Sequence, residues 1–334
     1  MKQSVENKFA QVWTVTGLFL SALVGAGFAT GREIFTYFVQ YGIWGFVGFV
    51  CACVCLGCCA FWMFTGKATL QPYRKLITLF TFCAYITMVA GFRDVLKLLF
   101  PEVAAHYPFL YGLCACGIVT AFSLFVLYKG FRFFAALGKV IPPVVLFNML
   151  FVCGAYLYQN GVSFAPSGQR EDLYRIWIST ILYVGYNVLF LAGVVLRSGT
   201  IKFDRKIHTK GSIVGTALFM LCGVSIYGVL LNQPLVVAQS SMPLYLLVQT
   251  WGVLRGKLFG LLLAFTMLFS AASAFCAAAG GGRKVHFTGK VLALLAIPVS
   301  YMGFDAFLSV VYPLFGVAGI FLFITLAQTH RKNV

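Results

Sequence analysis

Long apolar stretches, separated by short polar segments, follow one another along most of the chain. A helix needs roughly 20 mostly apolar residues to cross the hydrocarbon layer of a bilayer. Ten such stretches lie near residues 12–38, 43–65, 76–100, 108–128, 134–158, 175–198, 210–231, 252–278, 288–303 and 305–328. Their apolar residues are continuous and do not alternate as in barrel strands, and helices pair their own backbone groups in lipid. The pattern predicts an all-α polytopic membrane protein, a single transmembrane domain over residues 1–334 with ten transmembrane helices.

The composition excludes several other classes of protein. Of the 334 residues, 61% are hydrophobic and only 10% are charged, whereas a soluble domain typically has about 25% charged residues. A water-soluble enzyme, a disordered chain and a small disulfide-stapled secreted fold are therefore excluded. No soluble domain, low-complexity tract or long linker stands out in the sequence.

The distribution of Lys and Arg predicts the orientation in the membrane. If ten helices alternate, the N-terminus and the even-numbered connections share one side of the bilayer. Of the 25 Lys and Arg residues, 18 fall on that side, and seven do not: Arg32, Arg93, Lys97, Arg170, Arg175, Arg255 and Lys257. Cations concentrate on the cytoplasmic side, so both termini are expected in the cytoplasm and the protein in a bacterial inner membrane. The net charge of +17 then reflects topology and contact with anionic lipids, and no nucleic-acid partner is expected.

The first apolar stretch resembles a signal peptide at its start, since Lys2 and Lys8 precede it. It continues into Ile34–Tyr37, however, and the charge distribution requires a first helix that is retained. We expect no cleavage.

Five cysteines crowd the second stretch: Cys51, Cys53, Cys55, Cys58 and Cys59. Four of them would share one helical face, which is compatible with a thiolate metal site. The other interpretation is that cysteine serves here as a small, easily buried apolar residue. We favour the second, because no His or carboxylate lies nearby in the sequence, and we expect neither disulfides nor a metal at the cluster.

The first stretch is interrupted between residues 21 and 33. Gly25, Gly27 and Gly31 lie there, and glycine tolerates the backbone angles of an unwound helix. Unwound backbone at membrane depth is tolerated where it lines a cavity or binds something. Arg32 and Glu33 follow directly, and ionisable residues inside a membrane mark functional sites. Helix packing through the small residues Gly27 and Gly31 is the alternative.

A second interruption is expected in the sixth stretch, between residues 179 and 188. Its segment Val184-Gly185-x-Asn187 echoes Val24-Gly25-x-Gly27 in the first. Interrupted helices at corresponding positions indicate a transporter built from two repeats. Five helices per half make the repeats inverted, with boundaries at about 9–158 and 175–328. The alternative for the polar residues of this segment is ordinary hydrogen bonding between helices.

The two interruptions together predict a site for a small solute. The ends of half-helices carry partial charges, positive at the N-terminus, so paired breaks suit a zwitterion such as an amino acid. Glu33 is expected to relay a proton, to pair with Arg32 or to bind a substrate amine. The residues expected at the substrate are Val24, Gly25, Ala26, Gly27, Phe28, Glu33, Tyr183, Gly185, Tyr186 and Asn187.

Three segments resemble a known family. The segment Val24–Ile34 (VGAGFATGREI) resembles the start of the YkvI-like group of bacterial membrane proteins, and Tyr183–Asn187 (YVGYN) and Val311–Gly316 (VYPLFG) look like its later motifs. That group is similar to the amino acid–polyamine–organocation superfamily with its LeuT-like fold. The resemblance implies five-plus-five inverted repeats, with substrate held at breaks in helices 1 and 6.

The resemblance also implies a place for a coupling cation. In sodium-coupled relatives the ion lies between the first break and two hydroxyls of helix 8, which maps here onto the carbonyls of Ser21 and Val24 and onto Ser270. The second hydroxyl position is Ala271, with Ser273 one turn away. Some proton-coupled relatives use a lysine in helix 5 instead, but Lys139 is better explained as an interfacial lysine. The coupling ion, Na⁺ or H⁺, stays open, and no resident cofactor is expected.

These observations favour an ion-coupled secondary transporter with alternating access. Its expected partners are membrane lipids and a small organic solute, an amino acid or a related amine. A channel or a non-transporting receptor is the alternative, although no filter-like loop is evident. An enzyme is least expected, because the sequence has no phosphate-binding loop, nucleophile elbow or paired-histidine metal motif.

Overall fold

The computed structural model describes residues 7–65, 70–161, 173–198, 203–233, 237, 240–279, 285–299, 301, 303–304 and 307–332. Within these ranges all regular elements are helices. The principal ones are α1 (Lys8–Leu23), α2 (Ala26–Thr30), α3 (Arg32–Tyr37), α4 (Gly42–Thr65), α5 (Arg74–Leu99), α6 (Pro101–His106), α7 (Pro108–Lys129), α8 (Phe131–Gly138), α9 (Ile141–Asn160), α10 (Leu173–Ser198), α11 (Arg205–Leu231), α13 (Pro243–Thr250), α14 (Val253–Ala279), α15 (Val285–Val299) and α17 (Tyr312–Lys332).

The helices account for each of the predicted membrane spans. Eight helical segments of the described chain are long and apolar enough to cross a membrane. The first predicted span is divided among α1, α2 and α3, and the ninth corresponds to the 15-residue helix α15. The prediction of an all-α polytopic membrane protein is therefore confirmed.

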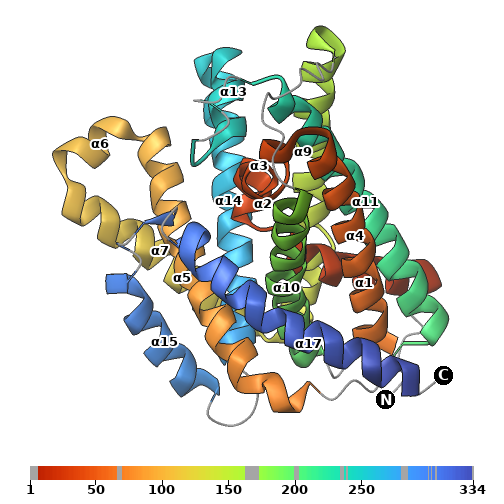
Figure 1. The fold of residues 1–334 in the computed structure, drawn as a ribbon. Helices are drawn as coiled ribbons and strands as arrows, with labels where there is room; N and C mark the ends of the chain where they lie inside the picture. The colour runs from red at the N-terminus through yellow and green to blue at the C-terminus, as the bar shows by residue number, and fades with distance from the viewer. Residues whose placement is uncertain are drawn as a thin grey trace.

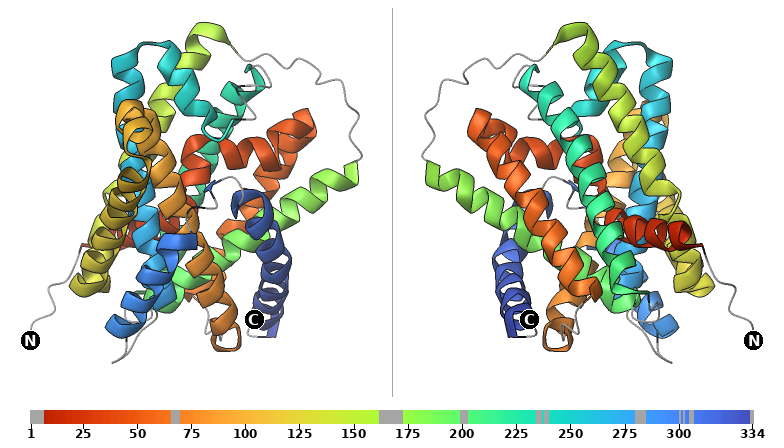
Figure 2. Two further views of the ribbon diagram at one scale, coloured as in Figure 1. Left: turned by 90° about the vertical axis from the view of Figure 1, so that its left-hand side faces the viewer. Right: turned by 90° about the vertical axis from the view of Figure 1, so that its right-hand side faces the viewer.

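The connecting helices α6 and α13 lie at one end of the bundle, uppermost in Figure 1, and several long helices, α4, α14 and α17, end at the other. The side views in Figure 2 show the same separation. The prediction places the α5–α7 and α11–α14 connections on one side of the membrane and the ends of α4, α14 and α17 on the other, and the two ends of the bundle agree with that order. The end that faces the cytoplasm stays a prediction.

The central packing joins helices from the two halves of the chain. Helix α5 packs along α14, α4 packs against α11, α1 against α11 and α4 against α10. Exchanging α1 with α10 and α4 with α11 converts the α1–α11 contact into the α10–α4 contact. That correspondence is what two inverted repeats would produce, and their boundaries stay a prediction.

The predicted break in the sixth span is wrong, because α10 is one continuous helix from Leu173 to Ser198. Gly185 serves a different purpose there. A Cβ atom on Gly185 would lie 2.0 Å from the carbonyl oxygen of Gly316 in α17, and one on Gly319 would lie 2.0 Å from that of Gly185. Small residues allow two helix backbones to touch in this way. Close packing of α10 on α17 thus explains Gly185 without a break in the helix.

Candidate functional site

The first predicted break is present and falls at Val24 and Gly25. Helix α1 ends at Leu23 and α2 begins at Ala26. The amide of Gly25 donates to the carbonyl of Leu23, 3.0 Å away, so it does not reach the carbonyl of Ser21 as a continuing helix would require. The break therefore frees backbone oxygens in the middle of the bundle.

Two of these oxygens are met by hydroxyls of α14. Ser270 donates to the carbonyl of Val24 at 3.2 Å, and Ser273 approaches the carbonyl of Ser21 at 3.5 Å. All three serine side chains are buried. The oxygen atoms that the resemblance assigned to a cation thus lie together, and the Ser273 hydroxyl lies beside the Ser21 carbonyl.

Glu33 reaches the same region from the other side of the break. Gly31, with a φ of 82°, ends α2 in the left-handed region that favours glycine, and the chain turns there into α3. The turn folds the Glu33 side chain onto Gly27 so closely that a Cβ atom at residue 27 would lie 2.2 Å from Glu33 Oε1. Glu33 is only 4% exposed. Tyr186 donates to Glu33 Oε2 at 3.0 Å.

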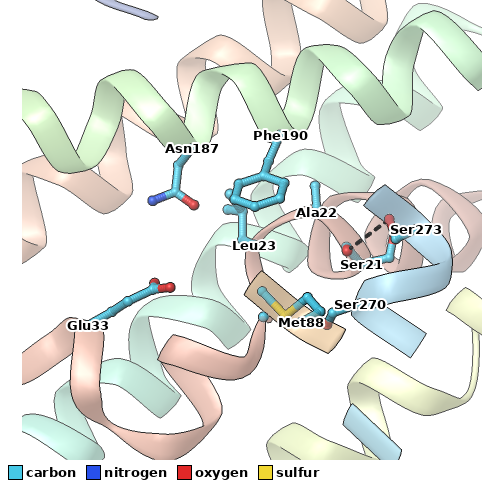
Figure 3. A pocket seen from close by; sticks show the side chains of 10 residues that line it. Ser21, Ala22, Leu23, Glu33, Met88, Asn187, Phe190, Ser270 and Ser273 are labelled. Carbon is cyan, nitrogen blue, oxygen red and sulfur yellow. Dashed lines mark hydrogen bonds between the residues drawn. The ribbon is translucent and has the colours of Figure 1, made fainter. Parts of the chain in front are cut away.

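A small closed cavity connects these groups. It is lined by Ser21, Ala22, Leu23, Gly25, Glu33, Met88, Asn187, Phe190, Ser270 and Ser273. Figure 3 shows the serines on one side and Glu33 and Asn187 on the other, with Leu23 and Phe190 between them. The cavity volume is about 10 Å³, enough for one water-sized particle. An amino acid does not fit, so a larger solute requires a more open conformation.

Four buried tyrosines surround the Glu33 end of this region. Tyr37 comes from α3, Tyr183 and Tyr186 from α10, and Tyr312 from the start of α17. The ring centroids of Tyr37 lie 5.5 Å from those of both Tyr183 and Tyr186. Those of Tyr186 and Tyr312 lie 4.9 Å apart. We call these four residues the tyrosine cluster.

The structure brings most of the predicted site residues to the break, but not all of them. Ser21, Gly25, Glu33, Asn187, Ser270 and Ser273 line the cavity, and Val24 contributes its carbonyl. Gly27 and Tyr186 contact Glu33, and Tyr183 belongs to the tyrosine cluster. Ala26 is fully buried in α2. Phe28 instead stacks on Phe219 with ring centroids 4.5 Å apart, and Gly185 packs on α17.

Sequence reasoning missed several residues of the region. Met88 and Phe190 line the cavity, and Tyr37 and Tyr312 belong to the tyrosine cluster. Tyr312 lies inside the motif Val311–Gly316 and could have been noticed there. The sequence does not point to Met88, because it does not show that α5 passes close to the first break.

The cysteines of α4 show no sign of a metal site. All 11 cysteines of the chain are free thiols. In the described part of the chain, no group of three or more His, Cys, Asp or Glu side chains is arranged to hold a metal ion.

Comparison with known sequences supports a membrane protein. No family model matches the chain. The uncharacterized membrane protein YkvI of Bacillus subtilis (strain 168) is 22% identical over 339 residues, covering 91% of each protein. This similarity agrees with the resemblance read from the sequence. Together with the helices it supports a multi-pass membrane protein.

Solved structures with the same arrangement of helices include two mutants of the manganese transporter of Eremococcus coleocola. They superpose with TM-scores of 0.53 and 0.52 at 13% and 14% sequence identity. Each alignment covers 98% of this chain and 79% of the transporter chain. At this identity the likeness shows a shared fold.

Proposed function

We propose that this chain is a secondary transporter that carries a small organic solute, an amino acid or a related amine, by alternating access coupled to Na⁺ or H⁺. One observation supports the proposal above the others. The first transmembrane helix is broken in mid-bundle, and its freed carbonyls, two serines of α14, Glu33 and Asn187 surround one closed cavity. Broken helices around a buried site are typical of transporters that alternate their access.

In this structure the cavity is too small for the solute that we propose. Its volume of about 10 Å³ admits an ion or a water molecule and excludes an organic solute. A solute site at the break must therefore open before binding and close afterwards. Because α10 is continuous whereas the first helix is broken, we expect the opening movement to involve α1, α2 and α3.

Sodium coupling is supported by the four oxygens at the serine end. The Ser21 and Val24 carbonyls and the Ser270 and Ser273 hydroxyls lie in two pairs 3.5 and 3.2 Å apart. Hydroxyls offer lone pairs as well as a donor, so an ion between these oxygens would replace the two hydrogen bonds. Proton coupling would use the buried carboxyl of Glu33 instead.

Manganese is a candidate cargo because the manganese transporter shares the fold. The ligand chemistry does not favour it, since hard divalent ions prefer several carboxylate or carbonyl oxygens. Glu33 is the one acidic side chain among the residues lining the cavity. We therefore treat Mn²⁺ as a competitor to be included in the assay.

Reconstitution tests the proposal. The purified full chain in liposomes is expected to take up a labelled amino acid or amine in a saturable way when a Na⁺ or H⁺ gradient is imposed. A non-saturating conductance would favour a channel. Binding without any flux would favour a receptor, and either result would overturn the proposal.

A further inference from the structure

Three tyrosine hydroxyls in the tyrosine cluster are buried without a proper partner. Those of Tyr37, Tyr183 and Tyr312 receive no hydrogen bond of normal geometry from any residue the structure describes, although Asn187 lies near Tyr183 and Thr87 near Tyr312. Buried hydroxyls are nearly always hydrogen-bonded. One unpaired hydroxyl, that of Tyr37, and two poorly paired ones, those of Tyr183 and Tyr312, leave acceptor positions open for a ligand in one place.

The carboxyl group beside them also lacks a cationic partner. Glu33 accepts a hydrogen bond from Tyr186, the fourth member of the cluster. Among the residues that the structure describes, Arg93 pairs with Asp94, and no Lys, Arg or His side chain forms an ion pair with Glu33. A carboxylate inside a membrane protein normally pairs with a positive charge, so the missing partner is expected to be positive.

The rings themselves favour the same kind of ligand. The cluster contains edge-to-face and tilted pairs, including Tyr183 and Tyr186 at 5.4 Å between ring centroids. Aromatic faces attract primary and quaternary ammonium groups alike, so the rings favour a cation and the hydroxyls decide which kind. The four tyrosine rings of the cluster come from α3, α10 and α17, so the cluster lies where three separate helices meet.

We infer that Glu33 and the tyrosine cluster recognise the ammonium group of a small primary amine. This inference rests on the proposed function and specifies the solute. A primary ammonium has three N–H donors, which match the Glu33 carboxylate and the unpaired hydroxyls. A quaternary ammonium has no N–H donor and would leave the hydroxyls unpaired, so the site discriminates against it.

The site is closed in the structure. The rings pack against each other, and the adjoining cavity of about 10 Å³ cannot hold an organic amine. Helix α3 carries both Glu33 and Tyr37 and is only six residues long. Movement of α3 away from α10 would open the space between the carboxyl and the rings.

Ligand-induced stabilisation of the purified full chain in sodium-free potassium buffer tests the inference. The probes are methylammonium chloride and tetramethylammonium chloride, with KCl as the ionic-strength control. Because binding raises the apparent Tm by mass action, methylammonium is expected to raise it in a saturable way. Such a small ligand binds in the millimolar range, so the titration extends to on the order of 100 mM. Tetramethylammonium is expected to bind at least about tenfold more weakly, since it satisfies no hydroxyl.

Substitutions locate the effect. Glu33→Gln is expected to abolish the methylammonium shift. Tyr312→Phe and Tyr37→Phe keep the ring and lose one hydrogen bond each, so the Kd should rise about two- to tenfold. Tyr85→Phe is the matched control, because Tyr85 is a buried tyrosine that bonds Thr120 away from the cluster, and it should bind methylammonium like the wild type.

Several outcomes would overturn the inference. These are a methylammonium shift no larger than that of KCl, equal affinity for the two ammonium probes, or unchanged binding in the Phe variants. If Glu33→Gln does not fold, methylammonium binding by Tyr37→Phe and Tyr312→Phe still tests the inference. Binding of methylammonium without uptake in liposomes would overturn the transport proposal alone. Uptake of a solute without an amine, unaffected by methylammonium, would overturn this inference alone.

Discussion

Among the single residues of the candidate site, Glu33 has the central place, because its carboxyl group contacts both the broken first helix and the tyrosine cluster. It lies against Gly27 of the broken helix and accepts a hydrogen bond from Tyr186 of α10. An isolated buried charge in a membrane is costly. A carboxyl kept in this place is therefore expected to exchange a proton or to bind a cation during transport.

Glu33→Gln tests that role. Glutamine preserves the shape and still accepts from Tyr186, but it cannot ionise, so coupled uptake in liposomes should be lost while the amount of protein in the membrane stays the same. Asn187→Ala should behave alike, because Asn187 lines the same cavity. Glu102→Gln in the exposed part of α6 is the control. Normal uptake by both cavity variants would remove these residues from the site.

The serines of α14 make a separate prediction. Ser270→Ala and Ser273→Ala each remove one oxygen from the proposed cation site, and a bond to a charged group contributes about 1.5–3 kcal/mol. The sodium concentration for half-maximal uptake should therefore rise roughly tenfold or more. Ser225→Ala, at a half-buried serine of α11 that donates to the carbonyl of Leu221, should leave it unchanged. Wild-type uptake that does not depend on the sodium concentration and depends on the pH gradient would contradict the sodium site.

Residues of the site differ in how far the sequence alone could place them. Glu33, Gly25 and Ser21 could be predicted because glycines and a charge interrupt an apolar run. Tyr37 could not be predicted. Tyr312 could be noticed as part of the motif Val311–Gly316, but not its proximity to Tyr186, which depends on how α17 meets α10. A tyrosine in an apolar helix carries no sign of its neighbours.

At the level of helices, the first break and the sixth helix show where glycine patterns mislead. Around Gly25 the chain bears two further glycines and the charged pair Arg32 and Glu33, and the helix is broken. Gly185 has no neighbouring glycine or charged residue, and α10 continues through it. One glycine costs a helix only about 1 kcal/mol, so packing decides whether the helix breaks.

Substitution of Gly185 tests the packing explanation. A Cβ atom there would meet the Gly316 carbonyl at 2.0 Å, so Gly185→Ala should force α10 and α17 apart and cost about 1–3 kcal/mol. Gly154→Ala is the matched control, since α9 offers open space around that position. Thermal unfolding in detergent should show a lower Tm for the first variant. Equal Tm values for the two would contradict the close contact of the backbones.

For the whole molecule, the apolar runs predicted an all-α polytopic membrane protein, and eight helical segments of the described chain are long and apolar enough to cross a membrane. The count of ten spans and their orientation stay predictions. The fold likeness to the manganese transporter supports the all-α membrane fold over nearly the full chain. The sequence could not give the closed state of the cavity, which depends on contacts among α1, α3, α10 and α14. Conformation along a transport cycle is a property of the assembled bundle.

The predicted orientation can be tested with a membrane-impermeant amine reagent. Lys257 lies near the start of α14, and Lys75 and Lys129 lie at the start of α5 and the end of α7; all three side chains are exposed. Cations concentrate on the cytoplasmic side. In intact cells the reagent should modify Lys257 and spare the other two until the membrane is permeabilised. Modification of Lys75 and Lys129 first would reverse the orientation.

Trans-stimulation in liposomes tests most directly whether the broken first helix carries a solute across the membrane. Vesicles containing the purified chain are preloaded with an unlabelled amino acid or amine, and the entry of the labelled compound is then measured. Alternating access predicts that preloading accelerates entry, and that Glu33→Gln removes the acceleration. Entry that is unchanged by preloading and proportional to concentration in the wild type would contradict the account.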